Sequence, residues 1–257
     1  MPYTPTPHLL VETDGPVTIL TLNNPDMRNA FLDDMHDAMQ EIWTDLSKDR
    51  SVRCVVLTGA GKAFSAGGDI PGFIKSYEDQ EHRRQSLRGA KRLMDAMADF
   101  PKPVVSAVNG AAVGLGCNVA VLADIVLMAE SAFMADTHVA IGLVAGDGGA
   151  AFWPLFMSIL KAKELLFLGD RISSAQAVEF GLANRVVPDD QLMPEALKLA
   201  HRLAELPQQA LQETKRAVNM HLQYAIDKVA PFALSAEAES FGTDDIRRTI
   251  EGFKKKA

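Results

Sequence analysis

An α/β fold is predicted for this 257-residue chain, because short apolar runs alternate along most of its length with segments whose apolar residues recur at helical spacing. Two of the apolar runs end in glycine-rich turns, and the residues after 188 show helical patterning only. The composition, 47% hydrophobic and 23% charged, is that of a globular protein that can bury a large core.

Local patterns place the individual elements. The β-rich run at 17–22 is bounded by turn residues, so it is predicted to be a strand. From Asp33 onward, Met35, Met39 and Ile42 fall at helical spacing. The following elements are expected in chain order: a strand at 17–22, a helix from 33, a strand at 52–57, a helix ending near 100, a strand at 104–108, a helix at 117–123, a strand at 125–129 and a helix at 150–160.

The part of the chain that follows Pro188 is predicted to be helical throughout. Residues 1–188 are therefore expected to form the α/β core, and residues 189–257 a helical C-terminal region. Pro194, Pro207 and Pro231 are expected to separate its helices.

Charge and cysteine usage exclude several classes of function. The net charge is −7 and the only basic run is 254–256, so no nucleic-acid partner is expected. Cys54 and Cys117 lie in apolar runs without metal-ligand or CxxC spacing, which predicts reduced thiols and a cytoplasmic protein, and the first residues show no secretory pattern. The apolar stretch 104–129 contains polar residues and glycines that disfavour a membrane span, so no membrane partner is expected. The common nucleotide, zinc-protease and serine-hydrolase motifs are absent from the sequence, and no metal is expected.

The two glycine-rich stretches, at 64–69 and 109–117, are the strongest functional signal. Glycine lets a backbone N–H approach a ligand closely, and two N–H groups aimed at one point form an oxyanion hole. The pair therefore points to a carbonyl substrate whose oxygen gains negative charge. Alternatively, each stretch is a tight turn that packs a strand against a helix.

Ordered blocks of sequence resemble the enoyl-CoA hydratase/isomerase (crotonase) superfamily over almost the whole chain. The resemblance implies a spiral of strand–strand–helix repeats whose helical C-terminal region takes part in oligomerisation, as a homotrimer or a dimer of trimers. It also implies an acyl-CoA thioester substrate in a bent conformation, with no cofactor other than the coenzyme A that belongs to the substrate. The blocks lie at 24–30, 61–70, 101–118, 142–149, 169–175 and 177–187.

The resemblance also assigns site residues. The amides of Gly68 and Leu115 would hold the thioester carbonyl, Leu115 standing where many members have glycine. The positions implied for coenzyme A binding are Arg28, Ala30, Ala63, Ala66 and Ile70, with Phe253 and Lys256 reaching a coenzyme A in a neighbouring subunit. Alternatively, Arg28 and Lys256 are ordinary solvated charges.

The chain departs from the family at the two glutamates that typical hydratases use, whose positions hold Asn118 and His138. Asn118 can orient a water or a carbonyl but cannot act as a base. Asp147, nine residues after His138, could orient the imidazole and raise its basicity, which would make an acid–base dyad. Alternatively, Asp147 caps the helix that starts near Gly149, and His138 is a loop residue bonded to Asp136.

Three functions remain open at this point. The leading hypothesis is hydration of a 2-enoyl-CoA through an enolate held by the two amides, as part of fatty acid metabolism. The His/Asp pair also resembles the subgroup of the superfamily that hydrolyses C–C bonds of cyclic β-diketones and needs no coenzyme A. The third hypothesis is a catalytically silent family member that binds coenzyme A.

Overall fold

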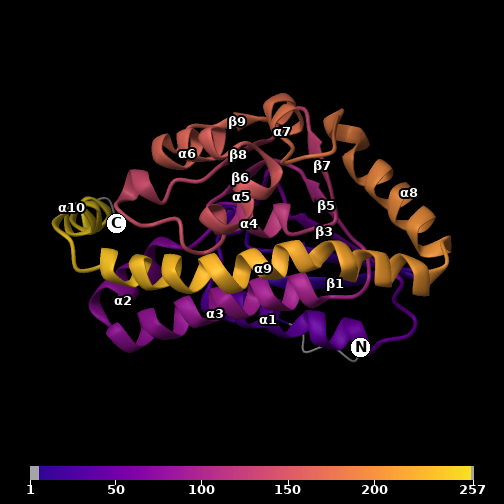
Figure 1. Cartoon of the computed structure of the whole chain (residues 1–257), viewed down its shortest axis with the longest axis horizontal. Helices are drawn as coiled ribbons and strands as arrows, with labels where there is room; N and C mark the ends of the chain where they lie inside the picture. Colours follow the sequence, from indigo (N-terminus) through magenta and orange to yellow (C-terminus); the bar gives the residue numbers. More distant parts are fainter. Residues whose placement is uncertain (1–5, 256–257) are drawn as a thin grey trace.

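Two sheets form the centre of the computed structural model, which describes residues 6–255 (Figure 1). The larger sheet has the strand order β1-β2-β3-β5-β7-β10, and the smaller one has the order β4-β6-β8-β9. Strand β1 pairs antiparallel with β2 and β9 antiparallel with β8, while the other neighbours run parallel. The strands are β1 (Leu9–Asp14), β2 (Val17–Leu22), β3 (Cys54–Gly59), β4 (Ala63–Ser65), β5 (Val104–Val108), β6 (Ala111–Val113), β7 (Ile125–Ala129), β8 (Phe133–Ala135), β9 (Ile172–Ser173) and β10 (Arg185–Val187).

Helices connect and cover the strands. Three of them are short 3-10 helices, labelled η. The helices are η1 (Pro25–Met27), α1 (Asp33–Lys48), α2 (Ile70–Glu78), α3 (Gln80–Asp99), α4 (Leu115–Val121), η2 (Val139–Ile141), α5 (Gly149–Phe156), α6 (Ile159–Leu168), α7 (Ser174–Phe180), η3 (Asp189–Gln191), α8 (Leu192–Glu205), α9 (Gln208–Ser240) and α10 (Asp244–Lys254).

The chain repeats a strand–strand–helix unit, as the resemblance implied. Strand β3 of the larger sheet is followed directly by β4 of the smaller sheet and then by α2, and β5 is followed in the same way by β6 and α4. Strands β7 and β8 repeat the step between sheets. Because β4, β6 and β8 are neighbours, the segments that follow them leave the small sheet at one edge. This edge positions the site described below.

Sequence patterns predicted the buried strands of the larger sheet well. Strands β2, β5 and β7 have the predicted bounds, and β3 starts two residues later than expected, at Cys54. Strand β1 was missed because its residues are mostly exposed beyond Leu9. The strands of the smaller sheet have only two or three residues each, which is too short for a periodic pattern.

Four expected helix boundaries were wrong. Helix α4 begins at Leu115 instead of Cys117, directly after Gly114. The helix expected at 150–160 is two helices, α5 and α6, and the Ser158 side chain caps α6 by accepting from the Lys161 N–H. Neither Pro194 nor Pro231 separates helices, because Pro194 lies in the first turn of α8 and α9 continues through Pro231 to Ser240.

The C-terminal helices pack on the rest of the same chain. Helix α8 contacts β2, β3, β5 and β7 through alanines four residues apart, among them Ala196, Ala200 and Ala204. Helix α9 runs alongside α3 and contacts α5 (Figure 1). One hydrophobic core includes residues on both sides of position 188. The oligomerisation role of this region stays a prediction.

None of the helices in the described part of the chain has both the length and the apolar character needed to span a membrane.

Candidate active site

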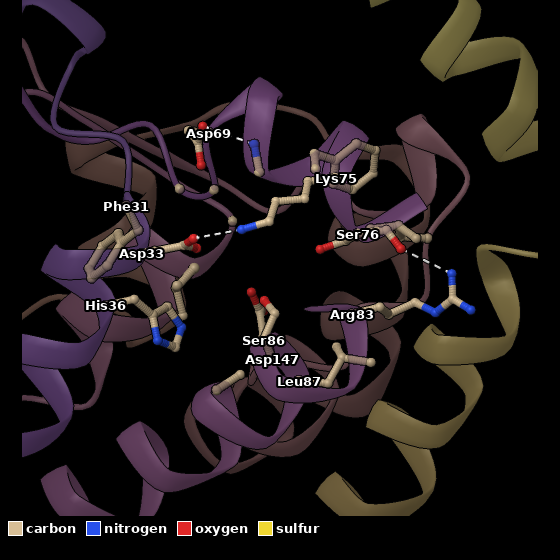
Figure 2. Close-up of a pocket in the computed structure, with 18 of the residues that line it drawn as sticks. Phe31, Asp33, His36, Asp69, Lys75, Ser76, Arg83, Ser86, Leu87 and Asp147 are labelled. Atoms are coloured by element: carbon tan, nitrogen blue, oxygen red, sulfur yellow. Dashed lines mark hydrogen bonds and ion pairs between the residues drawn. The ribbon is translucent and has the colours of Figure 1, made fainter. Parts of the chain in front are cut away.

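A cavity of about 490 Å³ opens where the segments after β4, β6 and β8 meet (Figure 2). Helices α1, α2 and α3 supply much of its wall, and residues of α9 and α10 complete it. Figure 2 shows Phe31 and His36 of the α1 side facing Ser76 and Arg83, with Asp147 between them. The cavity therefore brings together segments from both ends of the chain.

The two glycine-rich stretches touch each other at this cavity. Gly67 has a φ of 85°, and a Cβ on it would come within 2.6 Å of the Val113 carbonyl oxygen and 3.4 Å of the Leu115 nitrogen. Glycine is required there because the two turns pack backbone against backbone.

Gly68 and Leu115 both line the cavity. Leu115 is the first residue of α4, where a helix leaves its N–H groups without intrahelical acceptors. Within residues 6–255, neither the Gly68 nor the Leu115 N–H donates a hydrogen bond to a protein acceptor. The structure thus places two available backbone donors on one wall of the cavity.

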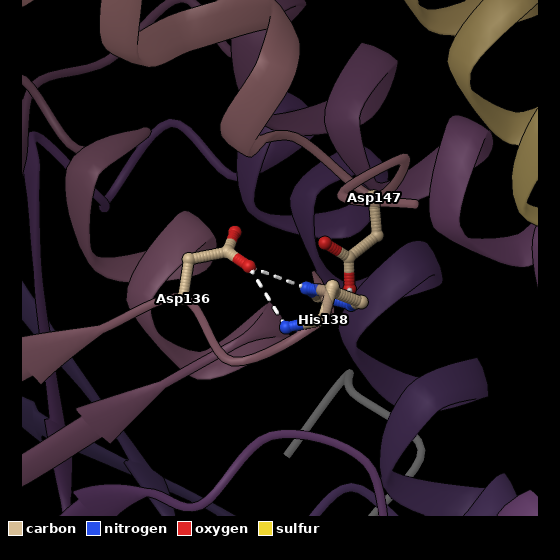
Figure 3. A group of neighbouring side chains, drawn as sticks. All are labelled: Asp136, His138 and Asp147. Carbon is tan, nitrogen blue, oxygen red and sulfur yellow. Dashed lines mark hydrogen bonds and ion pairs between the residues drawn. The ribbon is translucent and has the colours of Figure 1, made fainter. Parts of the chain in front are cut away.

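The imidazole of His138 lies between two carboxylates (Figure 3). Its Nδ1 is 2.7 Å from Asp136 Oδ1, and its Nε2 is 3.3 Å from Asp147 Oδ2. Asn118 donates from Nδ2 to Asp147 Oδ1 over 2.8 Å. All four residues are buried. His138 and Asp147 line the cavity, whereas Asp136 and Asn118 stand behind them.

Burial and charge act in opposite directions on His138. Burial alone would lower the pKa of the imidazole, but Asp147 and Asp136 outweigh it and raise that pKa well above its ordinary value. Burial likewise opposes ionisation of Asp136, but His138 and the hydrogen bonds around it leave the Asp136 pKa below its ordinary value. At neutral pH the pair is therefore an imidazolium and a carboxylate.

The structure contains contacts from both local interpretations of the segment. The bond from His138 to Asp136 exists, and so does the approach of His138 to Asp147. Asp147 does not cap α5, because Gly148 is its N-cap and no side chain bonds there. Asn118 donates to Asp147 and does not line the cavity, and its predicted contact with a water or a carbonyl stays a prediction.

Asp136, His138 and Asp147 each offer one atom within 4.8 Å of the others, a spacing that could hold a metal ion. Their contacts favour a different arrangement. His138 Nδ1 faces Asp136 and Nε2 faces Asp147. An ion bound at one ring nitrogen would therefore replace the contact with one carboxylate and leave the other carboxylate on the opposite side of the ring. The donor set is better suited to passing a proton along a hydrogen-bonded chain.

Comparisons with known proteins agree with the fold. The family model described as "Enoyl-CoA hydratase/isomerase" matches residues 12–257. The chain belongs to this family. It is 32% identical to a short-chain-enoyl-CoA hydratase of Clostridium acetobutylicum over 257 residues, covering 96% of this chain and 98% of that protein. It is 33% identical to a crotonyl-CoA hydratase of Syntrophomonas wolfei, covering 97% of this chain and 95% of that protein. The crystal structure of an enoyl-CoA hydratase/isomerase from Mycobacterium paratuberculosis superposes with a TM-score of 0.94 at 45% identity, covering 97% of this chain and 100% of that one.

The positions predicted to bind coenzyme A in this member of the enoyl-CoA hydratase/isomerase family divide into two groups. Ala66, Ile70 and Phe253 line the cavity, and Phe253 does so in its own chain, with its ring 6.1 Å from that of Phe73. Arg28, Ala30 and Ala63 do not line it, since Arg28 is exposed and Ala30 and Ala63 are buried elsewhere in the structure. Lys256 lies outside the described residues.

Sequence reasoning missed one buried acidic residue of the cavity, Glu237 on α9. Burial, opposed by His138 and reinforced by Asp147 and Asp136, raises the pKa of its carboxyl to about 8. A signal was present in the sequence. Ile226, Ala230, Ala233 and Glu237 follow one another at helical spacing on the buried face of α9, so a charged residue stands where an apolar one is expected.

Proposed function

We propose that this enzyme adds water across the double bond of a 2-enoyl-CoA. The thioester carbonyl oxygen accepts hydrogen bonds from the Gly68 and Leu115 N–H groups, which form an oxyanion hole. The observation that carries the proposal is the presence of these two free donors in one cavity with the His138–Asp147 pair. The relatives named as enoyl-CoA hydratases support the same reaction.

In this reaction the two backbone amides stabilise negative charge, and the His138–Asp147 pair accepts a proton. Attack of water at C3 moves electrons onto the thioester oxygen, and each of the two N–H donors stabilises that charge by about 3–4 kcal/mol. The water gives up a proton to the His138–Asp147 pair. Because His138 is already an imidazolium, the Asp147 carboxylate is the member that accepts it, while Asp136 fixes the ring. Protonation of C2 then completes the product.

A second candidate is hydrolysis of a C–C bond in a cyclic β-diketone. The observation that favours it is the same histidine between carboxylates, which stands where typical hydratases have a glutamate and which could activate water for attack on a carbonyl carbon. The enolate that leaves in this reaction would occupy the same pair of amides. The third candidate is a family member that binds coenzyme A without catalysis.

Assembly and location belong to the proposal as well. We expect a homotrimer or a dimer of trimers in the cytoplasm. Support comes from large apolar side chains that stay exposed on α6 and α9 of the single chain, among them Leu160, Phe167 and Phe232.

Binding and turnover measured together separate the three candidates. Calorimetry is done with crotonyl-CoA and with a cyclic β-diketone, and turnover of each is followed by absorbance. Hydration of crotonyl-CoA is the expected result. Binding of the thioester without turnover would favour the silent member, and turnover of the diketone alone would favour the hydrolase.

A proline at position 115 tests the amide pair directly. Proline is well tolerated at the first position of a helix but has no N–H, so Leu115→Pro removes one donor and leaves the fold. We expect kcat to fall about 10²–10³-fold. Leu115→Ala, which keeps the N–H, is the matched control and should retain most of the rate. Equal rates in the two variants would exclude the Leu115 amide from the reaction.

A further inference from the structure

Among the described residues that line the cavity, Glu237 is the one buried acidic group to which the steps above give no role. It enters from α9, near the C-terminus, whereas His138 and Asp147 belong to the segment after β8. Its side chain is nine-tenths buried, since only 6% of the residue is exposed. A buried carboxyl group needs either a partner or a proton.

The contacts of Glu237 place it beside Asp147. A Cβ on Gly146 would lie 2.4 Å from Glu237 Oε2 and 2.8 Å from the Ala233 carbonyl oxygen, so α9 packs directly on the backbone one residue before Asp147. Oε2 meets the geometry of a hydrogen bond with no described residue, and the backbone N–H of Gly146, which favours the carboxylate, acts on the pKa less than burial does. An ionised carboxylate with an unpartnered buried oxygen would be costly, and a neutral carboxylic acid fits this position.

The charged groups around Glu237 favour the neutral form. His138 is the cation that acts on it, and two carboxylates, Asp147 and Asp136, act in the opposite direction. Helix α5, which packs on α9, carries no titratable side chain, and the guanidinium of Arg83 on α3 donates to the Ser76 carbonyl and lies over the Phe241 ring. Two carboxyl groups with different environments, one ionised and one protonated, are the arrangement that acid–base chemistry requires.

We propose that Glu237 is a second catalytic group of this site, the acid that protonates C2 of the substrate while Asp147 takes the proton of the attacking water. This assignment rests on the proposed hydration. The oxygen of water bonds to C3, the C2–C3 double bond opens, and one proton of the water passes to the Asp147 carboxylate. The Glu237 carboxyl gives its proton to C2 and becomes a carboxylate. The proton on Asp147 then returns to Glu237 through solvent, so that both groups start the next turnover in their original states.

The pH dependence gives this role a distinct signature. The pKa of Glu237 is raised to about 8, so the acid is present at neutral pH and is lost as the pH rises through that value. The rate constant kcat/KM of the wild type for crotonyl-CoA should therefore fall on the alkaline side of pH 8.

The decisive variant is Glu237→Gln, which keeps the size of the side chain but cannot donate a proton from a carboxyl. We expect it to bind crotonyl-CoA as the wild type does, to lose about 10²–10⁴-fold in kcat, and to lose the alkaline fall near pH 8. Glu239→Gln, two residues along the same helix and exposed to solvent, is the control and should keep both the rate and the pH profile.

An infrared difference spectrum between wild type and Glu237→Gln at pH 7 gives a readout that needs no substrate. It should contain the carbonyl stretch of one protonated carboxylic acid, and its absence would overturn the proposal. If the wild type hydrates crotonyl-CoA and Glu237→Gln does so at the same rate, Glu237 is not the acid and the proposed function stands. If the wild type does not hydrate any enoyl-CoA, both assignments fail together.

Discussion

Histidine–aspartate pairs occur both in the cavity and on the surface of this molecule, with almost the same geometry. His8 and Asp34 are 2.7 Å apart, His201 and Asp14 are 2.8 Å apart, and His138 is 2.7 Å from Asp136. The surroundings differ. The His201 and Asp14 side chains are 38% and 54% exposed, whereas those of His138 and Asp136 are 10% and 0% exposed.

Distance alone therefore does not identify an acid–base site. Water and salt screen the surface pairs, and such exposed pairs contribute about 0–1 kcal/mol. The buried pair has a second carboxylate, Asp147, on the other ring nitrogen, and it faces a cavity that also holds two free backbone donors. Burial, a second partner and access to the cavity together distinguish the pair that we propose to be functional from the pairs on the surface.

The largest effect is expected when the imidazole is removed from the buried pair, and removal of an imidazole from an exposed pair is the comparison. In His138→Gln we expect kcat for crotonyl-CoA to fall about 10²–10⁴-fold, because the pair that accepts the proton of water loses its imidazole. In His201→Gln we expect the wild-type rate. Steady-state turnover of both variants checks this, with circular dichroism to confirm that each is folded. Full activity in His138→Gln would remove the histidine from the mechanism.

Much of the fold could be predicted from the sequence because the larger sheet is buried on both faces. Runs such as 104–108 and 125–129 are apolar except for Ser106, and their bounds matched the structure. The smaller sheet has no such signal, since each of its strands has only two or three residues. Those strands are stabilised by pairing with neighbours that are distant in sequence, and local periodicity does not record that pairing.

The site was predicted in part for a similar reason. Gly68, Leu115, His138 and Asp147 were named from local motifs read with the family resemblance, and all four line the cavity. Glu237 lies about 90 residues after Asp147 and reaches the cavity only because α9 packs on the Gly146 backbone. The sequence shows a glutamate on the buried face of a helix, but the neighbours that raise its pKa come from other elements of the fold.

A smaller effect is expected on protein stability, where the buried Glu237 can be compared with the exposed Glu239 of the same helix, α9. The ordinary pKa of a glutamate is 4.5 and that of Glu237 in the folded protein is about 8. Between these values the unfolded chain has released the proton while the folded protein still holds it. The stability that Glu237 contributes is therefore complete below pH 4.5 and is lost as the pH rises toward 8.

Replacing this carboxyl group should remove that loss. On going from pH 5 to pH 8, we expect the free energy of unfolding of the wild type to fall by on the order of 3–5 kcal/mol more than that of Glu237→Gln. Glu239→Gln is exposed and should keep the wild-type slope. Urea unfolding at a series of pH values measures the difference. Parallel slopes in wild type and Glu237→Gln would mean that the buried carboxyl titrates in the folded protein as it does in the unfolded chain. Glu237 would then resemble the exposed charges of the surface pairs more than its neighbours in the cavity.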